Sequence, residues 1–334
     1  MTAHKKSFDN GVQIGWDATS IELAQTCLRK YYYTMILGIR ESKKSVHLLF
    51  GGIYASALEN FYKYRAEGMD IQEALEEVVH EAMIASWEYK MNPDGTHQLT
   101  EDGKRIGGPK HFDDVKKTRN NLIRTIIWYV EQFGVENEDG LVTYHLQNGK
   151  PAVELSFTLE VDTDLLLCGH LDRVVSMGPH LYVMDQKTTG GTVGPYYFNQ
   201  FSPNNQMSLY SWAGRAILSS PIHGVIIDAA QIALNFTRFE RGVTPRSKDQ
   251  LTEWFASAKY TIKNAQYASD RWNHLSEEQK TPENLAAIWP MTLASCGNYG
   301  GCPFRLLCSR SPGVRENFIR ADYTEHNWDP LEAR

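Results

Sequence analysis

Two short runs decide the fold of this chain: Gly-His-Leu-Asp-Arg-Val-Val at 169–175 and Leu-Tyr-Val-Met-Asp-Gln-Lys-Thr at 181–188. Gly178 and Pro179 between them have the turn chemistry of a hairpin. We therefore expect two neighbouring strands joined by a turn at 176–180. Such a hairpin brings Asp172 and Asp185 side by side. Lys187 joins the face of Asp185, because strand residues two apart point the same way.

Two adjacent carboxylates repel each other unless a cation lies between them. Hard oxygen ligands of this kind suit Mg²⁺ or Mn²⁺. A metal ion beside a lysine is an arrangement suited to the hydrolysis of phosphodiester bonds. The alternative is an ordinary half-buried hairpin that carries surface charges.

The same residues resemble the core motifs of the PD-(D/E)XK nucleases, in particular the RecB-like branch. Gly169-x-x-Asp172 is followed by Asp185-x-Lys187, and the later Gln206-x-x-x-Tyr210 is similar to the Gln-x-x-x-Tyr motif of that branch. The resemblance implies that Asp172, Asp185 and the Gln186 carbonyl hold the metal, and that Lys187 orients and polarises the attacking water. Gln206 and Tyr210, four apart on a predicted helix and so on one face, would position the DNA strand, with Tyr210 stacking on a base.

A further pattern of that branch, Gly-x-x-x-His-x-x-x-Glu, is matched incompletely. The chain has Gly51 and Glu59 at the matching positions, but Ala55 stands where the histidine is expected. Glu59 lies one helical turn further along the same face, and it would replace the histidine as the third metal ligand. The other interpretation of Glu59 is a solvated carboxylate on a helix surface.

The cysteines form a second group of candidate ligands. Cys296, Cys302 and Cys308 lie close together in the sequence, and Cys27 lies far upstream. Four thiolates hold either zinc or an iron–sulfur cluster, and the paired Cys-x₂₋₄-Cys knuckles usual for zinc are absent. The distribution resembles RecB-like nucleases with a 4Fe–4S cluster, such as the AddB and CRISPR-adaptation types. The resemblance implies a cluster that joins the N-terminal helix to the C-terminus; zinc and unligated thiols are the alternatives. Cys168 is expected to be a core residue.

Hydrophobic periodicity organises the rest of the chain. It predicts helices at 20–38, with Ser20 as the N-cap, and at 53–64, 71–89, 111–133, 203–218 and 252–272. It predicts strands at 153–160 and 224–239, and residues 91–110 are expected to be a loop. The fold class is α/β, with a restriction-endonuclease-like mixed-sheet core. We expect a mainly helical region at 1–137, the nuclease core at 138–280 and a cysteine-rich segment at 281–334. The basic side chains of the helix predicted at 111–133 form either a solvated face or contacts with the DNA backbone; they are Lys116, Lys117, Arg119 and Arg124.

The composition of the chain limits the class of protein to which it can belong. The chain has 334 residues, of which 42% are hydrophobic and 22% charged, as is ordinary for a globular protein. A net charge of −6 argues against a general nucleic-acid coat, but not against a nuclease, because local basic patches bind phosphate. No apolar run approaches the roughly 18–20 residues of a membrane span, and the N-terminal residues do not form a signal peptide. A cytoplasmic protein with no membrane partner is therefore expected.

The resemblance implies a Mg²⁺- or Mn²⁺-dependent deoxyribonuclease, and an exonuclease rather than an endonuclease. Its substrate would be single-stranded DNA or DNA with free ends, in recombination, repair or replication. A helicase or recombination partner would act in trans, because the chain has no ATPase motif. Such enzymes also occur as stand-alone phage proteins, and an oligomer is compatible with the sequence. The alternative is an inactive nuclease-fold subunit for DNA binding or assembly. The retained acids and Lys187 argue against that alternative.

Overall fold

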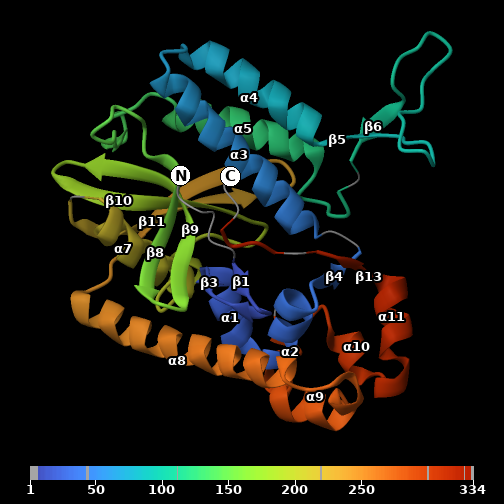
Figure 1. Ribbon diagram of the computed structural model, residues 1–334. Helices are drawn as coiled ribbons and strands as arrows, with labels where there is room; N and C mark the ends of the chain where they lie inside the picture. The colour runs from blue at the N-terminus through green and yellow to red at the C-terminus, as the bar shows by residue number, and fades with distance from the viewer. Residues whose placement is uncertain are drawn as a thin grey trace.

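The computed structural model describes residues 7–42, 45–110, 112–218, 220–298, 301–326 and 328–331. A mixed sheet of seven strands lies between two groups of helices (Figure 1). This arrangement confirms the α/β mixed-sheet core expected from the sequence. The boundaries at 137 and 280 stay predictions.

The longest strand, β9 (Leu165–Met177), lies at the middle of this sheet. It pairs antiparallel with β8 (Val153–Asp162) and with β10 (His180–Thr189), so the predicted hairpin is confirmed. Beyond β10 the sheet continues through β11 (Ile222–Ile232), which is parallel to β10, and β12 (Thr237–Thr244), which is antiparallel to β11. Two short strands, β3 (Gly15–Trp16) and β7 (Leu141–Thr143), also pair with β9.

The strands β9 and β10 separate near the middle of the sheet. Their pairing runs from His180 opposite Met177 to Met184 opposite Arg173. Beyond that point β10 follows β11 as far as Thr189, whereas β9 pairs with β8 on its other edge. The two strands therefore form a fork, and Asp172 and Asp185 are the first residues within it.

The strand predicted at 224–239 is two strands, β11 and β12. The chain reverses between them, and the Ala233 N–H donates to the Phe236 carbonyl at 3.0 Å. Leu234 and Phe236 in this turn are half exposed. The prediction was wrong because these apolar residues concealed the turn, for which Asn235 was the only local signal.

Three helices cover one face of the sheet: α3 (Val46–Ala66), α4 (Ile71–Ala85) and α5 (Arg119–Phe133). Their buried side chains form one cluster with residues of β8 and β11, which includes Phe50, Leu58, Phe61, Leu122, Ile126, Val153 and Ile232. This face matters for function because α3 passes over the fork (Figure 1). The sequence predicted that this helix begins at residue 53, but α3 begins earlier, at Val46.

The helix predicted at 111–133 begins only at Arg119, after the N-cap Thr118; His111 lies outside the described residues. Asp114 accepts hydrogen bonds from the backbone N–H groups of Lys116 and Lys117, so this segment is a turn. The Lys116 ammonium donates to the Gly190 carbonyl at 2.7 Å, and that of Lys117 to Thr188 Oγ1 at 3.2 Å. These two lysines therefore hold the end of β10 instead of forming part of a helix face.

The other face is covered by α1 (Ala18–Thr26), α7 (Asn205–Ile217) and α8 (Lys248–Asn273). The N-cap of α1 is Asp17, not Ser20, because the Asp17 carboxylate accepts from the Ser20 N–H at 2.8 Å. The helix predicted at 20–38 is interrupted at Cys27, which is extended with φ −168°. It resumes as α2 (Leu28–Tyr31) and a π-helical turn (Tyr32–Ile36).

The C-terminal part of the chain lies beside α2 (Figure 1). It contains α9 (Pro282–Ile288), α10 (Arg305–Ser309), α11 (Arg315–Asp322) and β13 (Tyr323–Glu325). The strand β13 pairs with β4 (Ile39–Glu41). The buried Arg29 donates to the carbonyls of Trp289 at 2.8 Å and Leu285 at 3.1 Å. The two ends of the chain are thus joined by backbone pairing and by a buried guanidinium.

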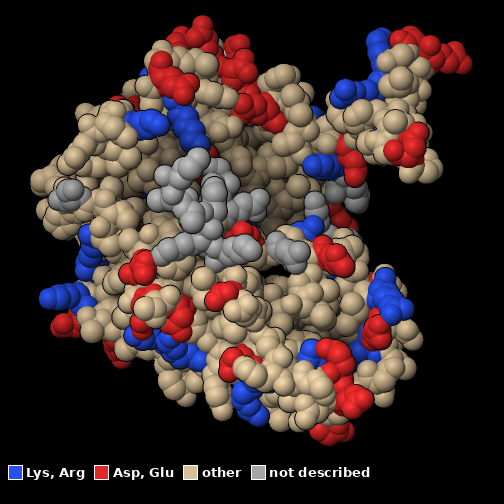
Figure 2. Space-filling model, viewed as in Figure 1, with Lys and Arg blue, Asp and Glu red and all other residues tan. Residues whose placement is uncertain are grey.

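Residues 91–110 form an arm that projects from the helical layer, not an irregular loop (Figures 1 and 2). Its base is the pair β5 (Trp87–Tyr89) and β6 (Gly107–Pro109), and beyond the base two single bridges, Met91 with His97 and Leu99 with Arg105, each close a turn of their own. Figure 2 shows charges of both signs on the arm. The remaining small elements include β1 (Phe8–Asp9), β2 (Val12–Gln13), α6 (Pro195–Asn199) and the 3₁₀ turns Glu277–Gln279, Leu293–Ser295 and Pro312–Val314. Among the described residues no helix has the length and apolar character to cross a membrane.

Replacing the buried guanidinium tests the link between the chain ends. Arg29→Met should lower the free energy of unfolding by about 1–3 kcal/mol, because the Trp289 carbonyl loses its buried donor. Urea unfolding followed by tryptophan fluorescence measures the change. Arg320→Met removes an exposed pair with Glu316 and should change stability by less than about 0.5 kcal/mol. Equal effects of the two variants would contradict this account.

Candidate active site

The fork between β9 and β10 brings two carboxylates together away from bulk water. Asp185 of β10 is fully buried and Asp172 of β9 is half-buried. The backbone N–H of Gln186 donates to Asp172 Oδ2 at 3.2 Å, so the two strands remain linked at this point. The predicted proximity of the two acids is therefore present in the structure.

Lys187 connects these acids to helix α7. Its ammonium lies 2.5 Å from Asp185 Oδ2 and donates to Gln206 Oε1 at 3.1 Å. The Gln206 amide in turn donates to the Tyr210 hydroxyl at 2.9 Å. Asn204 caps α7 and fixes where the helix begins. The three predicted motifs thus form one chain of hydrogen-bonded groups.

Tyr210 does not lie where stacking on a base requires. Only 7% of it is exposed, and it packs in the core beneath α7. Burial raises the pKa of Tyr210 well above its ordinary value, so its hydroxyl stays protonated. The expectation that Tyr210 stacks on a nucleotide is wrong for this structure; its hydroxyl supports Gln206.

The charges of the fork act strongly on one another. Burial, and then the charge of Asp185, raise the pKa of Asp172 to about 7. Burial also raises the pKa of Asp185, although Lys187 opposes the rise. For Lys187, burial by itself lowers the pKa, but the two carboxylates outweigh it and the net pKa is raised. Lys187 is therefore a stable cation that leaves one carboxylate charge uncompensated.

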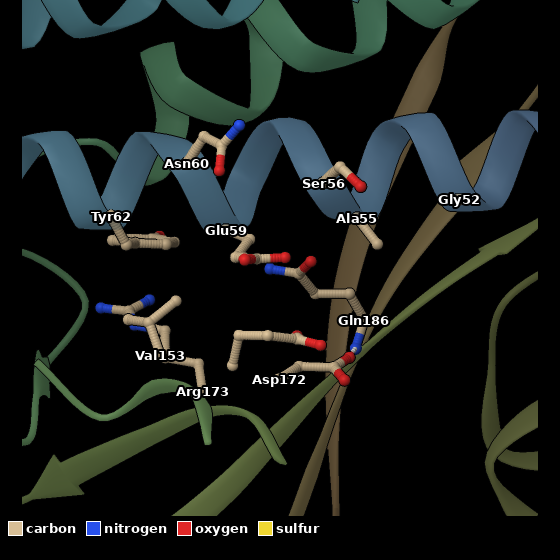
Figure 3. Close-up of a pocket in the computed structure, with 11 residues that line it drawn as sticks. Gly52, Ala55, Ser56, Glu59, Asn60, Tyr62, Val153, Asp172, Arg173 and Gln186 are labelled. Atoms are coloured by element: carbon tan, nitrogen blue, oxygen red, sulfur yellow. Dashed lines mark hydrogen bonds between the residues drawn. The ribbon is translucent and has the colours of Figure 1, made fainter. Parts of the chain in front are cut away.

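A cavity of about 350 Å³ lies between α3 and the fork (Figure 3). In Figure 3 the Glu59 side chain extends from α3 toward Gln186 and Asp172. Glu59 also forms an ion pair with Lys63, one helical turn away. Ala55, at the expected histidine position, lines the same cavity. The remaining lining residues are Gly52, Ser56, Asn60, Tyr62, Val153, Glu154 and Arg173.

Glu154 in this lining is a residue that the sequence interpretation missed. In the alternating strand 153–160 it occupies an outward position, which ordinarily faces water. Helix α3 covers that position, and only 7% of the Glu154 side chain is exposed. The available signal was the register of the hairpin formed by β8 and β9, which places Glu154 opposite Asp172.

The donor set at the fork fits a divalent cation with oxygen ligands. Asp185 Oδ1 is buried and has no hydrogen-bond partner among the described residues, although Lys187 lies against the other oxygen of the same carboxylate. Within those same residues, no three His, Cys, Asp or Glu side chains approach closely enough to hold a metal ion. Binding would therefore require the carboxylates around the cavity to move closer together.

The cysteines lie apart from the fork, where the two chain ends meet. Thr292 lies between two of them: its N–H donates to Cys27 Sγ at 3.4 Å, and its carbonyl lies 3.9 Å from Cys296 Sγ. Burial raises the pKa values of Cys302 and Cys308, and the charge of Cys27 contributes to both shifts. Cys168 is buried in β9, as expected for a core residue.

Asp172→Asn should remove part of the pH dependence of stability in metal-free protein. The native carboxyl has a pKa of about 7, whereas an unfolded aspartate titrates near about 3.9. Its stabilising contribution is complete below about pH 4 and is lost as the pH rises through about 7. In EDTA, the wild-type Tm should therefore fall more steeply than that of the variant between about pH 5 and pH 8. Equal slopes in thermal unfolding would show that Asp172 is ionised throughout.

The family comparison agrees with this geometry. The family model described as "PD-(D/E)XK nuclease superfamily" matches residues 16–309. Among solved structures, a "Putative exonuclease" from Eubacterium rectale matches with 12% identity and a TM-score of 0.42, over 81% of this chain and 92% of that chain. No curated protein matches the sequence. From the match over most of its length, the chain belongs to the PD-(D/E)XK nuclease superfamily.

Proposed function

We propose that this protein is a Mg²⁺- or Mn²⁺-dependent deoxyribonuclease that degrades single-stranded DNA from free ends. The connected set of Asp172, Asp185, Lys187 and Gln206, of which Asp172 lines the cavity, is the observation that supports the proposal most strongly. A fold without such a reaction gains nothing from placing two repelling acids in a buried fork.

Asp172 and Asp185 would bind the cation through their carboxylates, together with the Gln186 carbonyl and Glu59. The cation, when bound, supplies Lewis acidity toward the phosphate and its attacking water. Lys187 keeps its proton, so it acts as a fixed positive charge that orients the water and stabilises developing negative charge. Gln206 fixes the ammonium of Lys187, and Tyr210 fixes Gln206.

The dimensions of the cavity favour a single strand. At about 350 Å³ it has the size of a pocket for one small ligand, and α3 covers it. A cavity of this size favours one nucleotide of an unpaired strand over a duplex. Free ends of DNA are the proposed starting points, and a partner that supplies them in trans stays a prediction.

The inactive-subunit alternative rests on Ala55. Its methyl group lines the cavity and leaves the position without a ligand. Glu59 extends into the same space, so the cavity retains a carboxylate on the α3 side. We therefore favour an active enzyme over a subunit that only binds DNA.

Lys187→Met should reduce the cleavage rate by about 10²–10³ or more, because a positioned charge near the reacting phosphate is lost. The assay is digestion of end-labelled linear single-stranded DNA with Mg²⁺ and with Mn²⁺, beside a circular single strand and a duplex. Lys259→Met is the matched control, since Lys259 forms a half-exposed ion pair with Asp162 on the outer surface.

The linear strand should be degraded and the circular strand should persist. Cleavage of the circle would identify an endonuclease. A folded Lys187→Met protein with the control's rate would exclude the proposed mechanism, and absence of cleavage by the wild type would favour the inactive subunit.

We also propose that Cys27, Cys296, Cys302 and Cys308 bind a 4Fe–4S cluster. The contacts of Cys27 and Cys296 with Thr292, and the influence of Cys27 on the pKa values of the half-buried Cys302 and Cys308, support this assignment. The thiols must still draw together, because no three of the described side chains form a ready metal site. Bound there, the cluster would connect α2 to the C-terminal segment beside the Arg29 contacts.

Cys27→Ser should lose the iron and brown colour of anaerobically purified protein, because a 4Fe–4S cluster needs its four thiolate ligands. Cys168→Ser should keep both, since Cys168 is buried in β9. Iron and zinc content per chain, with the visible absorption spectrum, provide the measurement. Equal iron in Cys27→Ser and wild type would contradict the ligand set, and zinc in place of iron would contradict the cluster.

A further inference from the structure

Glu154 has an unusual backbone for a residue within a strand. Its φ is 50°, in the left-handed region that side chains other than glycine rarely adopt. Among the described residues, the other two non-glycine positions with positive φ are Asn10 and Asn137. Asparagine tolerates this region through local hydrogen bonds, whereas glutamate has no such advantage. The conformation of Glu154 therefore has a cost that other contacts must offset.

The register of the sheet places Glu154 beside the proposed metal ligands. Val153 pairs with Arg173 and Leu155 pairs with Leu171, so Glu154 lies opposite Asp172. Asp185 lies across the fork on the other side of β9. The three acids thus form a row across β8, β9 and β10. Glu154 lines the same cavity as Asp172 and Glu59.

His170 lies beside Glu154, two residues before Asp172 on β9. Its Nδ1 is 3.7 Å from Glu154 Oε1 and 2.9 Å from Ser156 Oγ. His170 therefore joins Glu154 to the neighbouring strand and restricts where the carboxylate can point. The Glu154 side chain is only 7% exposed, so water screens it poorly from Asp172.

A third acid adds repulsion to a site that already has one uncompensated charge. Glu154 is the weakest of the influences that raise the pKa of Asp172, after burial and the charge of Asp185. At the same site Asp185 Oδ1 is buried and has no hydrogen-bond partner in the part of the chain that the structure describes, which points to a further cation, beside Lys187, that the acids together attract. Neither the left-handed backbone nor the buried acid row benefits the fold by itself.

We propose that Glu154 is a further carboxylate of the active site that acts with Asp172 in binding the divalent cation. The left-handed backbone and His170 hold the side chain of Glu154 in that position. This inference rests on the proposed function, because it assigns Glu154 to the same metal site. It also accounts for a cavity that extends from the fork toward β8.

The test is direct binding of Mn²⁺ to the full-length protein, measured without DNA by electron paramagnetic resonance of the free ion. Glu154→Gln should weaken the affinity for Mn²⁺ by about tenfold or more. Glu160→Gln is the matched control, because Glu160 lies on the same strand and is exposed. That variant should bind Mn²⁺ as the wild type does.

Glu154→Gly gives a second, opposite readout. Glycine adopts positive φ without strain, so the Tm of this variant in EDTA should rise while its Mn²⁺ affinity falls. If Glu154 were only structural, both variants would lose Tm and keep wild-type affinity, which would overturn the inference.

Asp172→Asn separates this inference from the proposed function. If Asp172→Asn loses Mn²⁺ binding and Glu154→Gln keeps it, the metal site stands and only the role of Glu154 is excluded. If Asp172→Asn binds Mn²⁺ as the wild type does, the metal site itself is wrong.

Discussion

Repulsion between Asp172 and Asp185 is the interaction on which the rest of the site depends. Both carboxylates lie where β9 and β10 separate, and Lys187 compensates only one of them. The sheet holds this arrangement in place because β10 is fixed by β11 on its far side and β9 by β8. The rigid sheet therefore holds the two carboxylates close together against their repulsion, as a preorganised site requires.

The surrounding contacts follow from the need to fix Lys187. Gln206 accepts from its ammonium, and the buried Tyr210 hydroxyl accepts from Gln206. Lys117 holds Thr188 on β10, and Lys116 holds Gly190 just beyond the end of that strand. Both groups act on the orientation of one strand end, although they come from opposite sides of the sheet. The precision of the site is thus a property of several elements and not of the motif residues alone.

The sequence predicted best the features that depend on near neighbours. The hairpin, the proximity of Asp172 and Asp185 and the faces of α7 all follow from local spacing and turn residues. The features that it missed depend on tertiary contacts. Glu154 is polar at an outward position, and only the coverage by α3 makes it part of the cavity. The break at Cys27 and the turn before α5 likewise interrupt patterns that helical periodicity continues.

The pairing of β4 with β13 has a consequence for how the chain folds during its synthesis. During synthesis the N-terminal helices emerge first, but their partners in α9 and β13 emerge last. The segment from β8 to β12 is contiguous in sequence and can close its sheet earlier. Trp16 and Tyr31 stack on each other and are both fully buried in the finished protein. Until Trp289 is synthesised, Tyr31 would lack its ring contact with that residue. A chain interrupted before residue 285 therefore exposes an aromatic surface to chaperones and proteases, so cellular quality control can distinguish incomplete chains from complete ones.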